Sequence, residues 1–192
     1  MKILFLGNTD LELVDWLSHN GNDVVFMDDK ITYDYIYDLK SEIIISYGYK
    51  HIITKDIIQN FKGNIINLHI SYLPWNKGSA PNLWSFIDNT KKGVTIHFID
   101  EGIDTGDIIL QKELHFDEHS ETLSTSYNTL QEEIKQMFKD NWVDIINNNF
   151  KTKHQNIGDG SIHYDKGTNK FISSLDVTDV WNVPISELKK RL

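Results

Sequence analysis

Residues 63–78 read GNIINLHISYLPWNKG, an apolar run that ends in a polar pair and a proline-containing loop. The apolar part predicts a buried strand. Because residues two apart in a strand point to the same face, the side chains of Asn67 and His69 are expected to project together. Ligands bind at the carboxyl ends of strands in open α/β sheets. A histidine exchanges protons near neutral pH, and an amide N–H beside it can stabilise an oxyanion. The alternative is structural: an asparagine that caps the strand end and a histidine hydrogen-bonded in the loop.

Strand-like and helix-like segments alternate on both sides of this stretch. Short apolar runs predict further strands over residues 2–7, 23–27, 42–46, 93–99 and 108–113. Helices are expected between them: one that Thr9 and Glu12 begin with a capping box, and others near 33–39, after Thr54 and near 82–88. This alternation is typical of an α/β domain with an open, mostly parallel, Rossmann-like sheet flanked by helices.

The longest helix is predicted from about residue 122 to residue 148. Its apolar residues keep the three- and four-residue spacing of one buried stripe: Leu123, Tyr127, Leu130, Ile134, Phe138, Trp142 and Ile145. After residue 150 the pattern changes, with glycine-containing turns around 161–164 and a terminal helix through Leu188. We therefore expect one main domain over residues 1–150 and a short C-terminal tail, a hairpin plus a helix, packed on the same domain over residues 151–192.

The composition excludes several classes of protein. Hydrophobic residues make up 40% of the 192 residues and aromatic residues 11%, which excludes a disordered chain. Cysteine is absent, so thiolate metal sites are excluded and a reducing, cytoplasmic compartment is expected. No apolar run approaches the roughly 20 residues of a membrane span. The net charge of −9 disfavours a nucleic-acid partner, because phosphates bind basic surfaces. For the oligomeric state we expect a monomer or a weak dimer.

An acidic stretch, DEGIDTGD at residues 100–107, follows the predicted strand 93–99. Its spacing differs from that of a calcium-binding EF-hand loop, so no metal is predicted. Two interpretations stay open: a solvated turn, or a loop in which one carboxylate orients His69 while the glycines let the backbone approach a flat ligand. A nicotinamide enzyme is disfavoured, because Gly7 is followed by the polar residues 8–10 and not by a second glycine.

Taken together, the two stretches resemble the formyltransferases that use 10-formyltetrahydrofolate. The resemblance rests on residues 67–78 and 93–107 and extends from residue 1 to about residue 148. It implies that residues 1–150 form a formyltransferase catalytic domain and that Asn67, His69 and Asp104 are the catalytic residues. The family often has proline after the histidine, where this chain has Ile70, a departure that leaves the reacting groups unchanged.

The chemistry of these residue types agrees with this assignment. A neutral amine would attack the formyl carbon, and Asn67 and a protonated His69 would stabilise the tetrahedral oxyanion. Asp104 would orient His69 and help to relay the amine proton. The resemblance also implies that the folate lies against residues 47–53 and the acidic loop. Its expected contacts are Tyr49, His51, Ile53, Asp100, Glu101 and Ile103. The His51 and His97 side chains are interpreted as structural.

The molecule that accepts the formyl group is inferred from the loop 73–78 and the tail segment 160–164. These two segments most resemble those of the short sugar N-formyltransferases. Those enzymes act on nucleotide-linked 4-amino-sugars, including the pseudaminic-acid type. The expected substrate contacts are Gly7, Asn8, Trp75, Asn76, Lys77 and Tyr164. A methionyl-tRNA formyltransferase is disfavoured, because residues 151–192 are too few for its tRNA-binding domain. A glycinamide ribonucleotide formyltransferase, a formyltetrahydrofolate hydrolase and a non-catalytic binding module remain alternatives.

Overall fold

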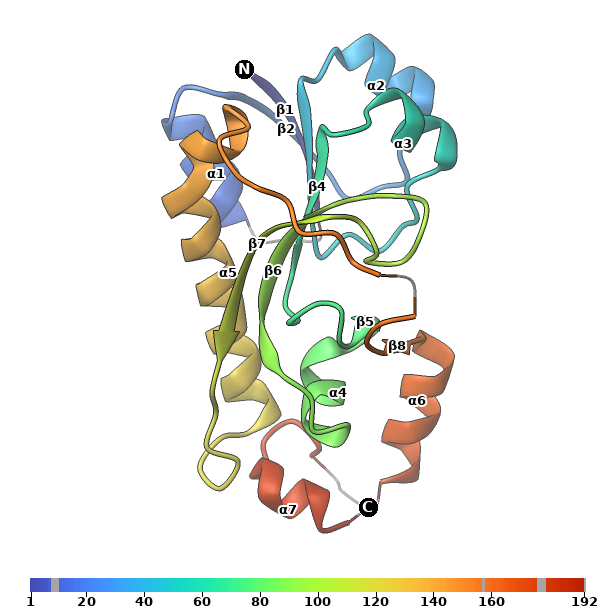
Figure 1. Cartoon of the computed structure of the whole chain (residues 1–192), viewed down its shortest axis with the longest axis vertical. Coiled ribbons are helices and arrows are strands. Elements are labelled where there is room, and N and C mark those ends of the chain that lie inside the picture. The colour runs from blue at the N-terminus through green and yellow to red at the C-terminus, as the bar shows by residue number, and fades with distance from the viewer. Residues whose placement is uncertain (8–10, 157, 176–178, 192) are drawn as a thin grey trace.

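The structure is a computed structural model that describes residues 1–7, 11–156, 158–175 and 179–191. At its centre lies a six-stranded sheet with the strand order β2-β1-β3-β4-β6-β7 (Figure 1). Four strands run parallel: β1 (Lys2–Gly7), β2 (Asp23–Met27), β3 (Ile43–Tyr47) and β4 (Ile65–His69). Strand β6 (Lys92–Phe98) pairs antiparallel with β4, and β7 (Ile108–Leu114) pairs antiparallel with β6. The predicted open, mostly parallel α/β sheet is thereby confirmed.

Helices cover both faces of this sheet. Helices α1 (Leu11–His19) and α5 (Leu123–Ile146) lie on one face, and α2 (Tyr33–Leu39) and α3 (Lys55–Asn60) lie on the other (Figure 1). Strand β1 shows why the parallel strands read as unbroken apolar runs. Its residues Ile3 and Phe5 pack toward α1 and α5, whereas Leu4 and Leu6 pack toward α2 and α3. A strand buried on both faces has no polar alternation.

Helix α5 buries the predicted stripe with one exception. Leu123, Leu130, Ile134, Phe138, Trp142 and Ile145 are buried, but Tyr127 is 41% exposed, so its predicted burial is wrong. The inward position in that turn belongs to Ser126, which is fully buried and donates a hydrogen bond to Oδ1 of Asn82. This hydrogen bond joins α5 to helix α4 (Pro81–Ile87), which carries Asn82.

One strand boundary and several helix caps differ from those predicted. Strand β3 begins one residue later than expected. Thr54 stands at the start of α3, but its side chain makes no capping hydrogen bond. Helix α5 is capped instead by a reciprocal pair, Thr122 and Thr125, each of which bonds the backbone of the other. The capping box predicted at Thr9 lies outside the described residues.

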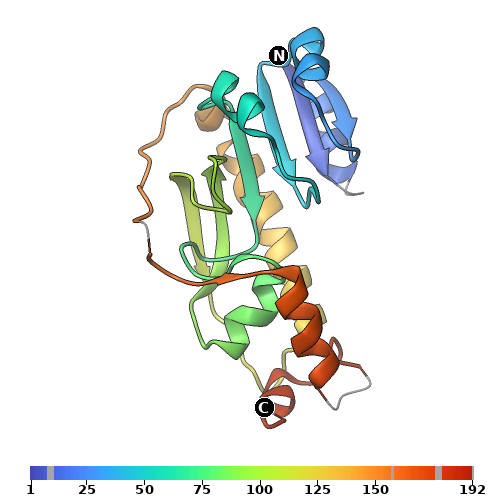
Figure 2. The same ribbon diagram turned by 90° about the vertical axis from the view of Figure 1, so that its right-hand side faces the viewer.

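The C-terminal tail packs along the sheet edge and the α4 end of the domain (Figure 2). Its short strand β8 (Ile162–His163) pairs in parallel with β5 (Lys77–Gly78), a strand within the loop after β4. Two helices follow, α6 (Asp165–Ser174) and α7 (Ile185–Lys189), where one terminal helix was predicted. Ile185 and Leu188 of α7 are buried against α4 and the start of α5. Among the described residues, no helix is long and apolar enough to cross a membrane.

We expect Phe138→Ala to lower the free energy of unfolding by about 3–5 kcal/mol, because the substitution leaves a cavity where a fully buried ring joins α5 to the sheet. Val143→Ala, on the exposed side of the same helix, should change it by less than about 0.5 kcal/mol. Urea unfolding followed by circular dichroism measures both values. Equal effects of the two substitutions would contradict the assigned packing of α5.

Candidate active site

The predicted residues Asn67, His69 and Asp104 meet at the carboxyl end of β4. Asn67 and His69 are two residues apart on this strand, and Asp104 lies in the loop between β6 and β7. One Asp104 carboxylate oxygen, Oδ1, is 3.4 Å from Nδ2 of Asn67, and the other, Oδ2, is 3.7 Å from Nε2 of His69. The spacing of two in β4 thus aims both side chains at one carboxylate.

His97 is a fourth member of this cluster. It faces Asn67 in the antiparallel register of β4 and β6, and its side chain is only 1% exposed. Its Nδ1 donates to the carbonyl of Phe98, since a carbonyl can only accept. Its Nε2 therefore points into the cluster, 3.3 Å from Nδ2 of Asn67 and 3.5 Å from Oδ1 of Asp104. His97 fixes the orientation of the Asn67 amide, a closer relation to the site than the sequence indicated.

The backbone around the site presents Asp104 to its neighbours. Asp104 has a φ of +53°, a left-handed conformation that is uncommon outside glycine. The N–H of Gly78 donates to Oδ2 of Asp104 over 2.8 Å. Gly78 has a φ of +82°, and a Cβ there would lie 2.3 Å from the carbonyl oxygen of His163. A glycine is therefore required at the point where the loop after β4 reaches the carboxylate.

Asp104 is ionised at neutral pH. Burial opposes the charge, but His69, His97 and the Gly78 N–H outweigh burial and hold the pKa of this carboxyl well below its usual range. The carboxylate is thus the negative charge at the centre of a cluster of two imidazoles, an amide and a backbone donor.

His69 is neutral at neutral pH. Burial lowers the pKa of its ring below 6.5, and His97 lowers it further. The Asp104 carboxylate and a hydrogen bond with the Asn76 backbone act in the opposite direction but do not outweigh burial. Nε2 of His69 is buried without a hydrogen-bond partner among the described residues, so the bond to the Asn76 backbone lies at Nδ1. A bond that raises a histidine pKa is donated by the ring. In the neutral ring Nδ1 then carries the proton and Nε2 a lone pair, and the lowered pKa favours this form over the predicted protonated His69.

The acidic loop predicted to hold the folate is tied to α3, the helix that follows the other predicted folate loop. Glu101 of the acidic loop forms an ion pair of 2.9 Å with Lys55 at the start of α3 and accepts a hydrogen bond from Gln59. Asp100 folds back on its own loop and accepts from the Gly102 N–H and the Thr105 hydroxyl. Both acidic side chains are thus used within the protein. The side chain of Ile103, 43% exposed, remains available to a ligand.

Residues 49–53 present little side-chain chemistry to a ligand. The Tyr49 hydroxyl donates to the carbonyl of Asp29 and accepts from the N–H of Ile31, which directs it toward β2 and α2. His51 is exposed and packs edge-to-face on the Tyr49 ring, and Ile53 is buried. The Tyr49 and Ile53 side chains are thus engaged within the protein, and the folate contacts predicted at Tyr49, His51 and Ile53 stay predictions.

The residues predicted to contact the substrate fall into two groups. Trp75 and Tyr164 are 36% and 60% exposed and are free to stack on a ligand. Gly7 is buried at the end of β1, paired with Tyr47, and Asn8 lies outside the described residues.

Asn76 and Lys77, by contrast, are buried and turned toward the tail. The Asn76 amide donates to Oγ1 of Thr90 and accepts from the hydroxyl of Ser161. Nζ of Lys77 donates to the carbonyl of Asp159. The protein itself thus occupies these two side chains, and their predicted substrate contacts stay predictions.

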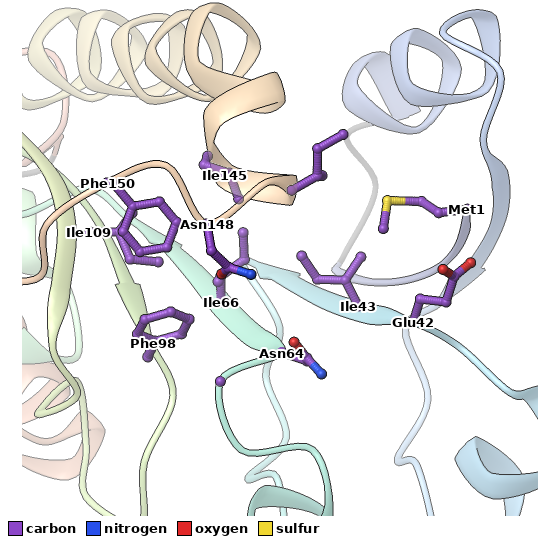
Figure 3. A pocket seen from close by; sticks show the side chains of 12 residues that line it. Met1, Glu42, Ile43, Asn64, Ile66, Phe98, Ile109, Ile145, Asn148 and Phe150 are labelled. Carbon is purple, nitrogen blue, oxygen red and sulfur yellow. The ribbon is translucent and has the colours of Figure 1, made fainter.

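A cavity of about 50 Å³ lies elsewhere, at the amino ends of β1, β3 and β4 (Figure 3). It is lined mainly by apolar side chains, with Glu42, Asn64 and Asn148 at its rim, and it contains none of the predicted site residues. Within the described parts of the chain, no cluster of three or more His, Cys, Asp or Glu side chains has the geometry to hold a metal ion.

Comparison with known proteins places the chain beside enzymes that transfer formyl groups. Residues 19–141 match the family described as formyl transferase. The chain is also similar to a crystal structure of the formyltransferase PseJ from Anoxybacillus kamchatkensis, in complex with UDP-4,6-dideoxy-4-formamido-L-AltNAc and tetrahydrofolate. The two sequences are 42% identical, the similarity covers 100% of both chains, and the TM-score is 0.91.

Curated relatives match over part of their length. A methionyl-tRNA formyltransferase from Clostridioides difficile (strain 630) is 36% identical over 115 residues, which cover 56% of this chain and 37% of that enzyme. A phosphoribosylglycinamide formyltransferase from Bacillus subtilis (strain 168) is 42% identical over 85 residues, which cover 44% of this chain and 43% of that enzyme. The matched segments thus span less than half of either relative.

We expect the His69 ring to titrate below 6.5, and Asp104→Asn to lower its pKa further, because the carboxylate opposes the effect of burial. NMR titration of histidine-labelled protein, with the signal assigned by His69→Gln, measures both values. Asp107→Asn, in the same loop but paired with His154, is the matched control and should leave the His69 pKa unchanged. A wild-type His69 pKa above 6.5 would show that burial does not govern this ring.

Proposed function

The chain belongs to the formyl transferase family, and we propose that it transfers a formyl group from 10-formyltetrahydrofolate to the primary amine of a nucleotide-linked 4-amino-sugar. The observation that carries this proposal is the full-length similarity to the PseJ structure, which holds a UDP-linked formamido-sugar and tetrahydrofolate. Those two molecules are the products that such a transfer would leave. The cluster of Asn67, His69 and Asp104 supplies the chemistry that the transfer needs.

His69 acts as the proton carrier. When the amine nitrogen bonds to the formyl carbon, that nitrogen becomes positively charged and must lose a proton. Nε2 of His69, unprotonated and without a hydrogen-bond partner among the described residues, is the base available at the site. The imidazolium that forms then returns the proton to the folate nitrogen as the bond between that nitrogen and the formyl carbon breaks. One N–H is consumed and one is formed, so the protons balance.

Asn67 stabilises the oxyanion of the tetrahedral intermediate. In the free protein its Nδ2 lies 3.3 Å from His97 and 3.4 Å from Asp104, distances longer than those of strong hydrogen bonds. These two long contacts orient the amide and occupy its N–H groups only weakly. A shift toward the developing charge exchanges a long hydrogen bond for a short one, which favours the transition state over the ground state.

Asp104 stabilises the imidazolium of His69. Its carboxylate is already ionised and lies 3.7 Å from Nε2, so the transferred proton arrives near a negative charge that needs no reorganisation. His97 and the Gly78 N–H hold the carboxylate in this place. We propose that the folate lies between residues 49–53 and the acidic loop, against the exposed side chains of Ile52 and Ile103.

Two properties favour a sugar acceptor over the alternatives. The net charge of −9 disfavours a tRNA, whose phosphates would meet an acidic protein. The methionyl-tRNA and phosphoribosylglycinamide enzymes match over less than half of their length, whereas the PseJ similarity covers the tail as well as the main domain. Trp75 and Tyr164, both exposed, offer aromatic faces on which a sugar or a base can stack.

We expect Asn67→Ala, His69→Ala and Asp104→Ala each to lower kcat by about 10²- to 10⁴-fold, since each removes a group that acts in the transition state. His115→Ala, which removes an exposed histidine outside the site, should keep the wild-type kcat. The assay follows release of tetrahydrofolate in the presence of 10-formyltetrahydrofolate and the UDP-linked 4-amino form of the sugar found with PseJ. A His69→Ala enzyme with the wild-type kcat would refute the assigned base.

The same assay, run with and without the amino-sugar, separates the classes of function. A transferase releases tetrahydrofolate only when the amine is present, a hydrolase releases it without amine, and a binding module releases none. We also expect full activity after treatment with EDTA, because the acidic loop lacks a recognised metal-ligand spacing. Activity that is lost with EDTA and restored by a divalent cation would overturn the metal-free mechanism.

A further inference from the structure

Residues 153–156 and 158–163 of the tail contact both loops that carry the candidate site. Figure 1 shows the chain after α5 passing the loop between β6 and β7, and β8 lying beside β5. At its start, Lys153 and Ile108 exchange two backbone hydrogen bonds of 2.9 Å. At its end, β8 pairs with β5, and His163 lies opposite Gly78. The segment therefore bridges the acidic loop and the loop after β4.

Gln155 holds the loop of Asp104. Its side chain is only 6% exposed, and its Nε2 donates to the carbonyl oxygens of Asp104 over 3.1 Å and of Gly106 over 2.7 Å. One of these carbonyls belongs to Asp104 itself, whose backbone is left-handed, and the other lies two residues later. An unfavourable backbone conformation persists where its surroundings fix it, and Gln155 supplies two of the fixing contacts.

Ser161 holds the opposite loop. Its hydroxyl accepts from the Asn76 N–H over 2.9 Å and donates to the Asn76 side chain over 3.1 Å. Its carbonyl accepts from the Lys77 N–H over 2.9 Å. The neighbouring Gly160 lies so close to Pro74 that a Cβ would come within 1.9 Å of the Pro74 carbonyl oxygen. The tail is thus fitted tightly against residues 74–78.

The loop after β4 contacts both catalytic side chains, and one of these, Asp104, lies on the acidic loop. Gly78, next to Lys77, donates to the Asp104 carboxylate, and the Asn76 backbone accepts from the His69 ring. The 2.8 Å contact between Gly78 and Asp104 therefore joins a loop held by Ser161 to a loop held by Gln155.

We propose that Gln155 and Ser161 are positioning residues for formyl transfer, which together set the Asp104 carboxylate against Gly78 and His69. This inference rests on the function proposed above. The tail is then a working part of the catalytic site, although none of its residues needs to touch the reacting atoms. A misplacement of about 1 Å in a catalytic group can cost on the order of 100-fold in rate, so loosening either contact should affect turnover.

The test compares Gln155→Met and Ser161→Ala, singly and together, with two matched controls. Methionine keeps the length of glutamine but cannot donate a hydrogen bond. The controls are Gln136→Met on α5 and Ser173→Ala on α6, which remove an exposed glutamine and an exposed serine away from both loops. The assay uses 10-formyltetrahydrofolate and the UDP-linked 4-amino-sugar, and NMR titration gives the His69 pKa of each variant. The titratable side chains that face His69 are Asp104 and His97.

Each single variant is expected to lower kcat by about 10- to 100-fold with KM changed by less than about threefold. The His69 pKa should fall, because a displaced Asp104 no longer opposes the effect of burial. The double variant should lose less than the product of the two single losses, since both residues act on one contact. Ser161→Thr, which keeps the hydroxyl, should retain most of the activity. Both controls should match the wild type.

Loss of rate in proportion to loss of folded protein, with the His69 pKa unchanged, would overturn the proposal and leave the tail a stabilising element. Wild-type kcat in both single variants would overturn it as well. If Gln155→Met does not fold, Ser161→Ala and Ser161→Thr decide the matter by the same readouts. A wild-type protein that transfers no formyl group would refute the proposed function itself, a result distinct from any failure of the variants.

Discussion

The site depends on one buried negative charge, the carboxylate of Asp104. A carboxylate inside a protein costs several kcal/mol unless charged or hydrogen-bonding partners replace its water. Segments far apart in the chain supply these partners: Asn67 and His69 from β4, His97 from β6, and the Gly78 N–H from the loop after β4. The same contacts that keep the carboxylate ionised also fix the positions of the Asn67 amide and the His69 imidazole. The contacts that stabilise the buried charge are therefore the same contacts that set the geometry of the site.

The sequence predicted the parts of this site that depend on local rules. The alternation of side chains along a strand placed Asn67 and His69 on one face, and the apolar runs predicted most of the sheet and both layers of helices. His97 and Ser161 depend on pairings between distant segments, β4 with β6 and β5 with β8, whose registers cannot be read from one strand alone. The polar residues Thr95 and His97 within an otherwise apolar strand were the available signal. Ser126 shows the same limit in α5, because its hydrogen-bond partner Asn82 lies on α4, a separate helix.

The protonation state of His69 is likewise a property of the assembled site. From its residue type alone, an imidazole beside a carboxylate is expected to be protonated. In the folded protein His69 is buried, and burial outweighs the attraction of Asp104, so the ring is neutral with a lone pair on Nε2. We therefore propose that His69 acts as a base and not as an oxyanion donor, and that Asn67 stabilises the oxyanion. The carboxylate then acts on the imidazolium that forms during the reaction.

The dependence of kcat on pH tests this role of His69 most directly. With both substrates saturating, the rate is measured from about pH 6 to about pH 10, a range that spans the titration of the amine and of an ordinary histidine. If neutral His69 is the base, kcat rises as the amine and the ring lose their protons, and then stays on a plateau through the alkaline range. If the reaction instead requires a protonated His69, kcat falls on the alkaline side with the pKa of a histidine, and the assignment of neutral His69 as the base is contradicted.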